Sequence, residues 1–350
     1  MKQRFGCLVH KGLAEVRERE LPALDEHDVL LKPLACNICT SDYTQWMGQR
    51  EHQGYPMAGG HELSGVVVAV GSAVSTVKPG DFVAPMPPSG CGSCEACRVG
   101  KMMECTNRQD THPTADGYVS GWFGFADLTV RRDYQIYRMN DQLDPSDAAF
   151  MEPLSTVVHG MKKLRIRPYE TVVVIGGGTM GLLNALTART YNCRVIVSEG
   201  MQNKLETAAQ LGLETVDFTK CDPVQTVKDL TQGKGADAVI VCVGNKAANA
   251  QALKMVKELD GRVLFFAAAH PAPPLEIDSN ELHYRKLELL GTYGGDMTDW
   301  EDAAMLLNTG RVVVSKLVEP EKFGLNHIQE AFAAASVPGK FRVSVLCQED

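Results

Sequence analysis

The sequence has no long apolar run, no excess of basic residues, and no repeated or low-complexity segment. No stretch approaches the roughly 20 apolar residues that a membrane-spanning helix needs. The formal net charge of −8 argues against a nucleic-acid-binding protein, because such proteins present basic faces. The first residues, Met1 to Gly6, contain no apolar signal core, so we expect a cytoplasmic protein.

Disulfide bonds within the chain cannot pair all of its cysteines, because their number, 11, is odd. Four of them follow the spacing C-x2-C-x2-C-x7-C, which is typical of a structural zinc site closed to substrate. The alternative, two disulfides, requires an oxidising compartment. The scattered cysteines are interpreted as small core residues. The predicted structural zinc ligands are Cys91, Cys94, Cys97 and Cys105.

The length of 350 residues exceeds what a single hydrophobic core usually holds, so two domains are expected. The first part of the chain shows short strand-like runs separated by Pro and Gly, which indicates a small barrel or rolled sheet. A further strand-like region is predicted over 118–138, and a helix is predicted over 145–157. Strand-like runs in the first part cover 28–35, 65–70 and 82–84.

From Thr171 onward, continuous apolar strands alternate with helical segments, as in a doubly wound α/β domain with a parallel sheet. Two more helices and a last strand follow Tyr293. The strands are predicted at 172–175, 194–197, 238–243, 262–266, 287–290 and 341–346, and the helices at 179–191, 203–211, 247–259, 300–308 and 327–335.

A glycine-rich loop follows the first strand of this α/β segment and fits the pattern G-x-G-x-x-G. Because it ends a buried strand and opens a helix, we expect it to hold the pyrophosphate of a dinucleotide. Glu199 ends the second strand, where its carboxylate can accept from ribose hydroxyls and repel a 2′-phosphate, which favours NAD over NADP. A Gly-rich turn without a cofactor is the other interpretation. The predicted cofactor contacts are Gly176, Gly178, Thr179, Met180, Gly181, Glu199, Lys204 and Val243.

A second zinc, with an exchangeable position, is predicted from Cys39, His61, Glu62 and Glu152. Glu62 is adjacent to His61, so both side chains cannot point the same way from a regular strand. A second carboxylate on the metal also makes the site negative and weakens it as a Lewis acid. We therefore expect His61 to be fixed and Glu62 to be mobile, sharing its role with Glu152. Asp42 is a candidate to orient His61.

These motifs together resemble the zinc-dependent medium-chain dehydrogenase/reductase family, in particular its polyol (sorbitol-type) branch. The resemblance implies a GroES-like catalytic domain over 1–155 and 294–350, with the structural-zinc lobe at about 91–108, and a Rossmann NAD-binding domain over 156–293. It also implies two zinc ions per chain, and a homodimer or homotetramer. Glu152-Pro153 resembles the polyol branch, whereas Thr44 and Gln45 depart from common family residues.

The expected reaction is the reversible transfer of a hydride between a secondary alcohol of a polyol or sugar alcohol, phosphorylated or not, and NAD. Ser41 is the candidate proton acceptor, unless it only caps local backbone. One alternative substrate is a different hydroxy compound, such as a hydroxy amino acid or a short diol. A non-catalytic NAD-binding protein on the same fold is the alternative from another class.

Overall fold

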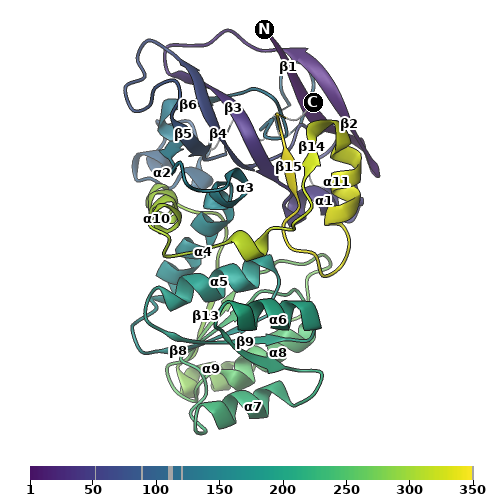
Figure 1. The fold of residues 1–350 in the computed structure, drawn as a ribbon. Helices are drawn as coiled ribbons and strands as arrows, with labels where there is room; N and C mark the ends of the chain where they lie inside the picture. Colours follow the sequence, from purple (N-terminus) through teal and green to yellow (C-terminus); the bar gives the residue numbers. More distant parts are fainter. Residues whose placement is uncertain (52, 88–89, 109–112, 120, 349–350) are drawn as a thin grey trace. The chain divides into compact units, whose positions relative to one another are not determined.

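The structure is a computed structural model that describes residues 1–51, 53–87, 90–108, 113–119 and 121–348 (Figure 1). The chain forms two compact units. One comprises Met1–Ser155 and Gly295–Asp350, and the other comprises Thr156–Gly294. Among the described residues, no helix is long and apolar enough to cross a membrane.

The first unit contains a two-stranded antiparallel sheet and a seven-stranded mixed sheet. The mixed sheet has the order β14-β15-β3-β4-β5-β7, and β6 pairs with β3. The antiparallel register of β3 and β4 sets Asn37 opposite Glu62, so the end of one strand lies beside the start of the other. The strands are β1 (Lys2–His10), β2 (Leu13–Glu20), β3 (Asp28–Asn37), β4 (Glu62–Val70), β5 (Phe82–Pro85), β6 (Thr129–Arg132), β7 (Ile136–Arg138), β14 (Phe323–Gly324) and β15 (Ser344–Leu346).

Short helices lie between these strands, and an apolar core joins the strands to the helix near the end of the chain. Ile38, Leu63 and Phe125 pack in that core with Phe332, and each of these side chains is almost fully buried. The helices that include residues of this unit are α1 (Thr40–Trp46), α2 (Glu95–Arg98), η1 (Met102–Glu104), η2 (Asp133–Gln135), α3 (Pro145–Ala148), α4 (Met151–Leu164), α10 (Met297–Asn308), η3 (Ser315–Leu317), η4 (Leu325–His327) and α11 (Ile328–Ala335).

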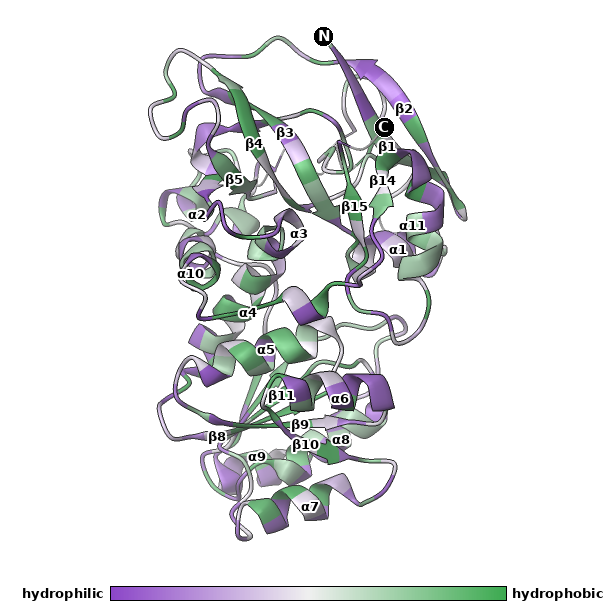
Figure 2. Cartoon of the chain, in the orientation of Figure 1, coloured by the Kyte–Doolittle hydropathy of each residue, from purple (hydrophilic) through white to green (hydrophobic). Residues whose placement is uncertain are grey.

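The second unit is a doubly wound α/β domain, which confirms the predicted fold class. Its six strands are all parallel, in the order β10-β9-β8-β11-β12-β13. The central strands are apolar because helices cover both faces, and Figure 2 shows them in the colour of hydrophobic residues. The elements are β8 (Thr171–Ile175), α5 (Thr179–Arg189), β9 (Arg194–Glu199), α6 (Gln202–Gln210), β10 (Glu214–Asp217), α7 (Pro223–Leu230), β11 (Ala238–Val241), α8 (Lys246–Met255), β12 (Arg262–Phe265), α9 (Ser279–Arg285) and β13 (Glu288–Gly291).

Several elements differ from the sequence-based expectation. The sequence analysis did not predict β10, α7 and α9. Helix α9 has no buried residue, so its sequence lacks an apolar period. Helix α7 has a recognisable start at Asp222-Pro223, where the Asp222 side chain accepts from Val224 N–H and Gln225 N–H. Cys221, interpreted as a core residue, is exposed.

Helix α3 provides a prediction about pH. Burial, together with the charge of Asp144, raises the pKa of Asp147 to about 6. Between about pH 4 and pH 6 the folded state therefore keeps a proton on Asp147 that the unfolded chain has already released. As the pH rises through this range, the free energy of unfolding falls, because the buried carboxyl group must become charged; below about pH 4 Asp147 is neutral in both states and causes no loss. Asp147→Asn should raise the free energy of unfolding at pH 7 by about 1 kcal/mol and change it little at pH 3.5. This value is smaller than the full pKa shift implies, because the Asp147 side chain is partly exposed to solvent.

Denaturant unfolding at both pH values measures this effect, with the exposed Asp141→Asn as the matched control. An equal effect of Asp147→Asn at the two pH values would contradict the assignment.

Candidate active site

Cys39 lies where strand β3 gives way to helix α1, as the N-cap of that helix. Asp42, in the first turn, accepts a hydrogen bond from the Cys39 N–H at 3.0 Å through Oδ2. Its other oxygen, Oδ1, lies 3.7 Å from Nδ1 of His61. One buried carboxylate thus contacts the backbone of Cys39 and faces the ring of His61, at a separation too long for the hydrogen bond that would orient the ring.

The backbone before His61 requires glycine. Gly60 has φ +88, and a Cβ there would lie 2.6 Å from the Phe125 backbone nitrogen. The tight approach of Phe125 and the left-handed backbone together turn the chain into β4. His61 is thereby buried, with its ring edge-on to Trp122 at a centroid distance of 5.1 Å.

Three side chains offer metal-binding atoms to one point. The Cys39 sulfur, a His61 nitrogen and a Glu62 oxygen all lie within 4.8 Å of one another. Burial alone would lower the pKa of His61, but the negative charges of Asp42 and Cys39 outweigh it and raise that pKa well above its ordinary value. The cluster therefore favours a cation, and sulfur with imidazole nitrogen is a donor set that suits zinc.

Glu62 is held by a residue that the sequence analysis did not identify. Arg342 donates from Nε to Oε2 at 2.8 Å and from Nη2 to Oε1 at 2.7 Å, forming a bidentate ion pair. The Glu62 side chain is 0% exposed and that of Arg342 5% exposed. The Nη2 of Arg342 also lies 3.7 Å from the Cys39 sulfur. In the structure Glu62 is thus paired with Arg342, a partner that the expectation of a mobile carboxylate did not include.

A signal for Arg342 exists in the sequence. It stands between the apolar Phe341 and Val343, in a segment predicted to be a strand. A buried guanidinium needs an acidic partner, and that requirement could have directed attention to Glu62.

Glu152 lies in the first turn of α4, outside the group of three metal-binding side chains. Burial is the main cause that raises its pKa to about 7. The charges of Glu62 and Asp42 add to the effect, whereas His61 and Arg342 oppose it. Across the described residues, the Glu152 carboxylate has no hydrogen bond or ion pair. It is therefore the uncommitted carboxylate beside the cluster.

Ser41, the candidate proton acceptor, lies on α1 together with Thr44 and Gln45, the two departures from common family residues. Ser41 is partly exposed there. The Thr44 hydroxyl donates to the Thr40 carbonyl at 2.7 Å, so its proton is bonded within its own helix. Gln45 is fully buried, and its amide donates to the Gly54 carbonyl at 3.1 Å. Gln45 thus holds the following loop, a role that a sequence comparison at this position does not reveal.

The four-cysteine lobe places all its sulfur atoms within 4.8 Å of one another. Backbone N–H groups point at the sulfurs: Cys91 N–H donates to the Cys105 sulfur at 3.2 Å, and Cys94 N–H to the Cys91 sulfur at 3.4 Å. Hydrogen bonds from Ser93 are the main cause that lowers the pKa of Cys91 to about 5. The four thiols are free, and those of Cys94 and Cys105 are 3.8 Å apart, so the arrangement fits a tetrahedral metal better than disulfides.

In the α/β unit, the glycine-rich loop follows β8 at the point where the strand order reverses between β8 and β11. Gly176 has φ +102, and a Cβ there would lie 2.6 Å from Val243 Cγ1. A Cβ on Gly181 would lie 1.8 Å from the Gly176 carbonyl oxygen, so the helix could not pack there with any other residue. Gly178 is the N-cap of α5, and Thr179 and Met180 form its first turn. Lys204 Nζ is 3.6 Å from the position of a Cβ on Gly178.

Glu199 is closer to this loop than expected. Its Oε2 accepts from Gly177 N–H at 2.6 Å, and its Oε1 accepts from Gly200 N–H at 2.7 Å and Met201 N–H at 2.9 Å. The carboxylate thus fixes the loop as well as ending the second strand. These geometries fit a dinucleotide, with backbone and a helix N-terminus available to the phosphates.

Two family models match the chain. The model described as alcohol dehydrogenase GroES-like domain covers residues 25–141, and the model described as zinc-binding dehydrogenase covers residues 179–309. The chain is 33% identical over 329 residues to L-threonine 3-dehydrogenase of Bacillus subtilis (strain 168), a match that covers 91% of each chain. It is 29% identical to sorbitol dehydrogenase of Halalkalibacterium halodurans over 89% of each chain.

A zinc-binding dehydrogenase of Sinorhizobium meliloti 1021, solved with bound NADP, superposes with a TM-score of 0.86 at 28% identity and covers 99% of each chain. Together, the matched models and relatives account for both units of the structure. The chain therefore belongs to the zinc-dependent medium-chain dehydrogenase family, whose cofactors are zinc and a nicotinamide dinucleotide and whose polyol dehydrogenases are among its relatives.

Proposed function

We propose that the protein oxidises a secondary alcohol of a polyol or sugar alcohol and transfers the hydride to NAD. The observation that carries this proposal is the Cys39–His61 pair with the uncommitted carboxylate of Glu152 beside it. Cys39 and His61 would hold the zinc. Glu62, paired with Arg342, would be the third candidate ligand. A bound zinc supplies Lewis acidity to a substrate hydroxyl, and NAD supplies the hydride acceptor.

The chain's own groups have distinct roles in this proposal. Glu152 would accept a hydrogen bond from a second hydroxyl of the substrate, which is a feature that polyols have and simple alcohols lack. The nearby charge of Asp42 would favour one orientation of the His61 ring. Ser41 accepts the hydroxyl proton and passes it toward solvent, since it is partly exposed on α1.

L-Threonine is the second candidate substrate, favoured by the 33% identity to the threonine dehydrogenase of Bacillus subtilis (strain 168). Threonine also has a secondary hydroxyl next to a polar group, so the described site does not exclude it. A panel of xylitol, sorbitol, galactitol 1-phosphate, 2,3-butanediol and L-threonine, each with NAD and with NADP, separates the candidates. We expect the highest kcat/KM with a polyol and NAD. Preference for threonine would replace the proposed substrate, and absence of any alcohol-dependent NADH would reject the activity.

Ser41→Ala should slow turnover by about a hundredfold while leaving the zinc content unchanged, because it removes a general base and no metal ligand. Steady-state kinetics and metal analysis measure the two quantities. The exposed neighbour Thr40→Ala is the matched control and should keep its activity. Full activity of Ser41→Ala would rule out the proton transfer.

Glu199→Gln should lower the ratio of kcat/KM for NAD to kcat/KM for NADP by about tenfold, equivalent to about 1.4 kcal/mol. Glutamine keeps one carbonyl oxygen for the backbone N–H groups, loses the second acceptor oxygen, and removes the charge that repels a 2′-phosphate. Glu206→Gln, on the exposed face of α6, is the control. An unchanged ratio would show that Glu199 serves only to fix the loop.

A further inference from the structure

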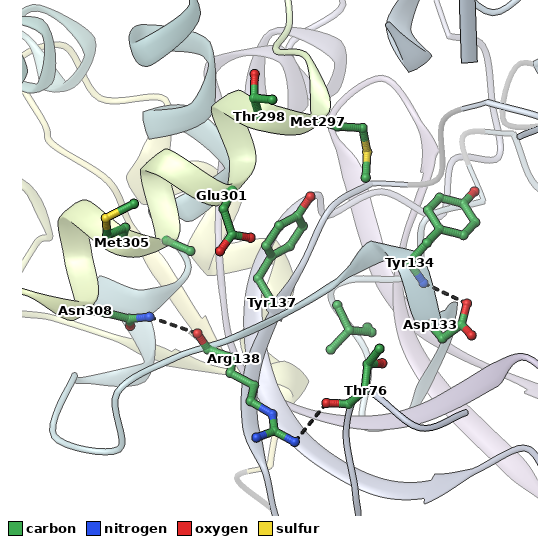
Figure 3. A pocket seen from close by; sticks show the side chains of 12 residues that line it. Thr76, Asp133, Tyr134, Tyr137, Arg138, Met297, Thr298, Glu301, Met305 and Asn308 are labelled. Carbon is green, nitrogen blue, oxygen red and sulfur yellow. Dashed lines mark hydrogen bonds between the residues drawn. The ribbon is translucent and has the colours of Figure 1, made fainter. Parts of the chain in front are cut away.

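A pocket of ≈ 860 Å³ lies between helix α10 and strand β7, in the unit that contains the four-cysteine lobe (Figure 3). None of the residues proposed for zinc or NAD lines it. Its size lies within the range of small-molecule sites in proteins. The residues that matter for its chemistry are Tyr134, Tyr137, Arg138, Met297, Glu301 and Met305.

One face of α10 forms a wall of this pocket. Met297, Glu301 and Met305 recur every four residues and therefore share a helix face. The opposite face is buried, with Trp300 and Leu307 in the interior. Met305 remains 53% exposed, so the described residues leave the pocket face of the helix uncovered.

The guanidinium of Arg138, which lines the pocket, already has partners within the protein. Arg138 forms an ion pair with Asp81 at 3.1 Å, and its Nη2 donates to the Thr76 carbonyl at 2.8 Å. The carboxylate of Asp133, another lining residue, is hydrogen-bonded to His27 Nδ1 at 2.9 Å. In the part of the chain that the structure describes, the carboxylate of Glu301 has no hydrogen bond or ion pair.

Figure 3 shows Glu301 and the Tyr137 ring next to each other in the pocket. Burial raises the pKa of Tyr137 above its ordinary value, and the charge of Glu301 adds to this effect. The pocket thus combines one uncommitted carboxylate, two tyrosine rings and two methionine thioethers. Glu301 is exposed, so its charge is hydrated in the free protein; it would repel an anion and attract a cation that enters the pocket.

We propose that this pocket binds an organic cation, a guanidinium or alkylammonium group on a short aliphatic chain. The carboxylate of Glu301 pairs with the charge, and a planar guanidinium can also stack on a tyrosine ring. Met297 and Met305 pack against the aliphatic part, because thioethers adapt to apolar groups of varied shape. The proposal adds a second site to the enzyme and does not depend on which alcohol it oxidises.

Calorimetry with butylguanidinium and its neutral counterpart butylurea tests the proposal on the full-length, zinc-loaded protein. We expect butylguanidinium to bind with a millimolar dissociation constant, and butylurea to bind at least about fivefold more weakly. Glu301→Gln should weaken butylguanidinium by about fivefold, whereas Glu258→Gln, an exposed control, should leave it unchanged. Methyl resonances of Met297 and Met305 should shift on binding, which locates the ligand independently of affinity.

Two further probes distinguish the source of the cation. Agmatine represents a free metabolite, and N-acetyl-arginine-N-methylamide represents an arginine of a protein chain. Tighter binding of the peptide mimic assigns the site to a protein partner, and tighter binding of agmatine assigns it to a small molecule. No binding of any cation, equal binding of butylurea, or unchanged binding by Glu301→Gln would overturn the proposal.

Discussion

Replacing Arg342 by methionine should lower the free energy of unfolding by about 3–5 kcal/mol, because it leaves the buried carboxylate of Glu62 without a partner. The side chains of Arg342 and Glu62 are 5% and 0% exposed, and Arg342 donates two short hydrogen bonds to Glu62. Chemical denaturation of the metal-free and the zinc-loaded protein measures the loss. Bound zinc should make this loss of stability smaller, because the metal gives the Glu62 carboxylate another positive neighbour.

Two matched variants make this result specific. The double variant Glu62→Gln/Arg342→Met should recover much of the loss, because replacing both partners of a buried pair leaves no unpaired charge. Arg194→Met breaks an exposed pair with Glu214 and should cost at most about 1 kcal/mol. A small loss in Arg342→Met, similar to that of Arg194→Met, would contradict the importance given to the buried pair.

His61→Ala should remove one of the two zinc ions per chain and reduce kcat by roughly a thousandfold or more, since zinc supplies several kcal/mol of transition-state stabilisation. The second zinc, in the four-cysteine lobe, should remain, because its ligands lie in a separate group. Metal analysis and steady-state kinetics provide the two readouts.

The partly exposed His27→Ala is the control, and it should retain both zinc ions and full activity. A His61→Ala variant that kept two zinc ions, or one that kept its activity after losing one, would show that His61 does not hold a catalytic metal.

Much of the fold could be predicted because its determinants are local in the sequence. The alternation of apolar strands and helices after Thr171 defines a parallel sheet. The glycines at 176 and 181 occupy places where a Cβ would meet Val243 or the backbone. The four cysteines occur close together in the chain, and the structure places their sulfurs within 4.8 Å. Each of these features depends on neighbouring residues, so spacing alone identifies it.

The features that were missed depend on residues far apart in the chain. Arg342 and Glu62 meet across the sheet that joins the two ends of the first unit, and no short motif links them. Gln45 was noted only as a departure from common family residues, whereas its burial and its hydrogen bond to the Gly54 carbonyl show that it holds the following loop. Glu199 was assigned to a ribose, whereas its bonds to Gly177 and to its own turn also fix the loop. In each case, tertiary packing decided which partner a polar side chain takes.

Helix α10 shows a further limit of sequence patterns. Its buried face was recognisable as an amphipathic helix, and the predicted span of 300–308 lies inside the observed Met297–Asn308. Glu301 lies on the exposed face of this helix, and an amphipathic pattern does not reveal a pocket beside it. The pocket between this face and β7 follows only from the packing of two segments that are distant in the sequence.

The central claim is that Cys39 and His61 hold a zinc ion while Arg342 keeps Glu62 in place. A crystal structure of the zinc-loaded protein, with diffraction data collected at the zinc absorption edge, tests it most directly. We predict an anomalous peak about 2.3 Å from the Cys39 sulfur and about 2.0–2.1 Å from a His61 nitrogen, with the Glu62–Arg342 pair intact. Absence of a peak at these two side chains, or a Glu62 that has left Arg342 to bind the metal, would contradict the account.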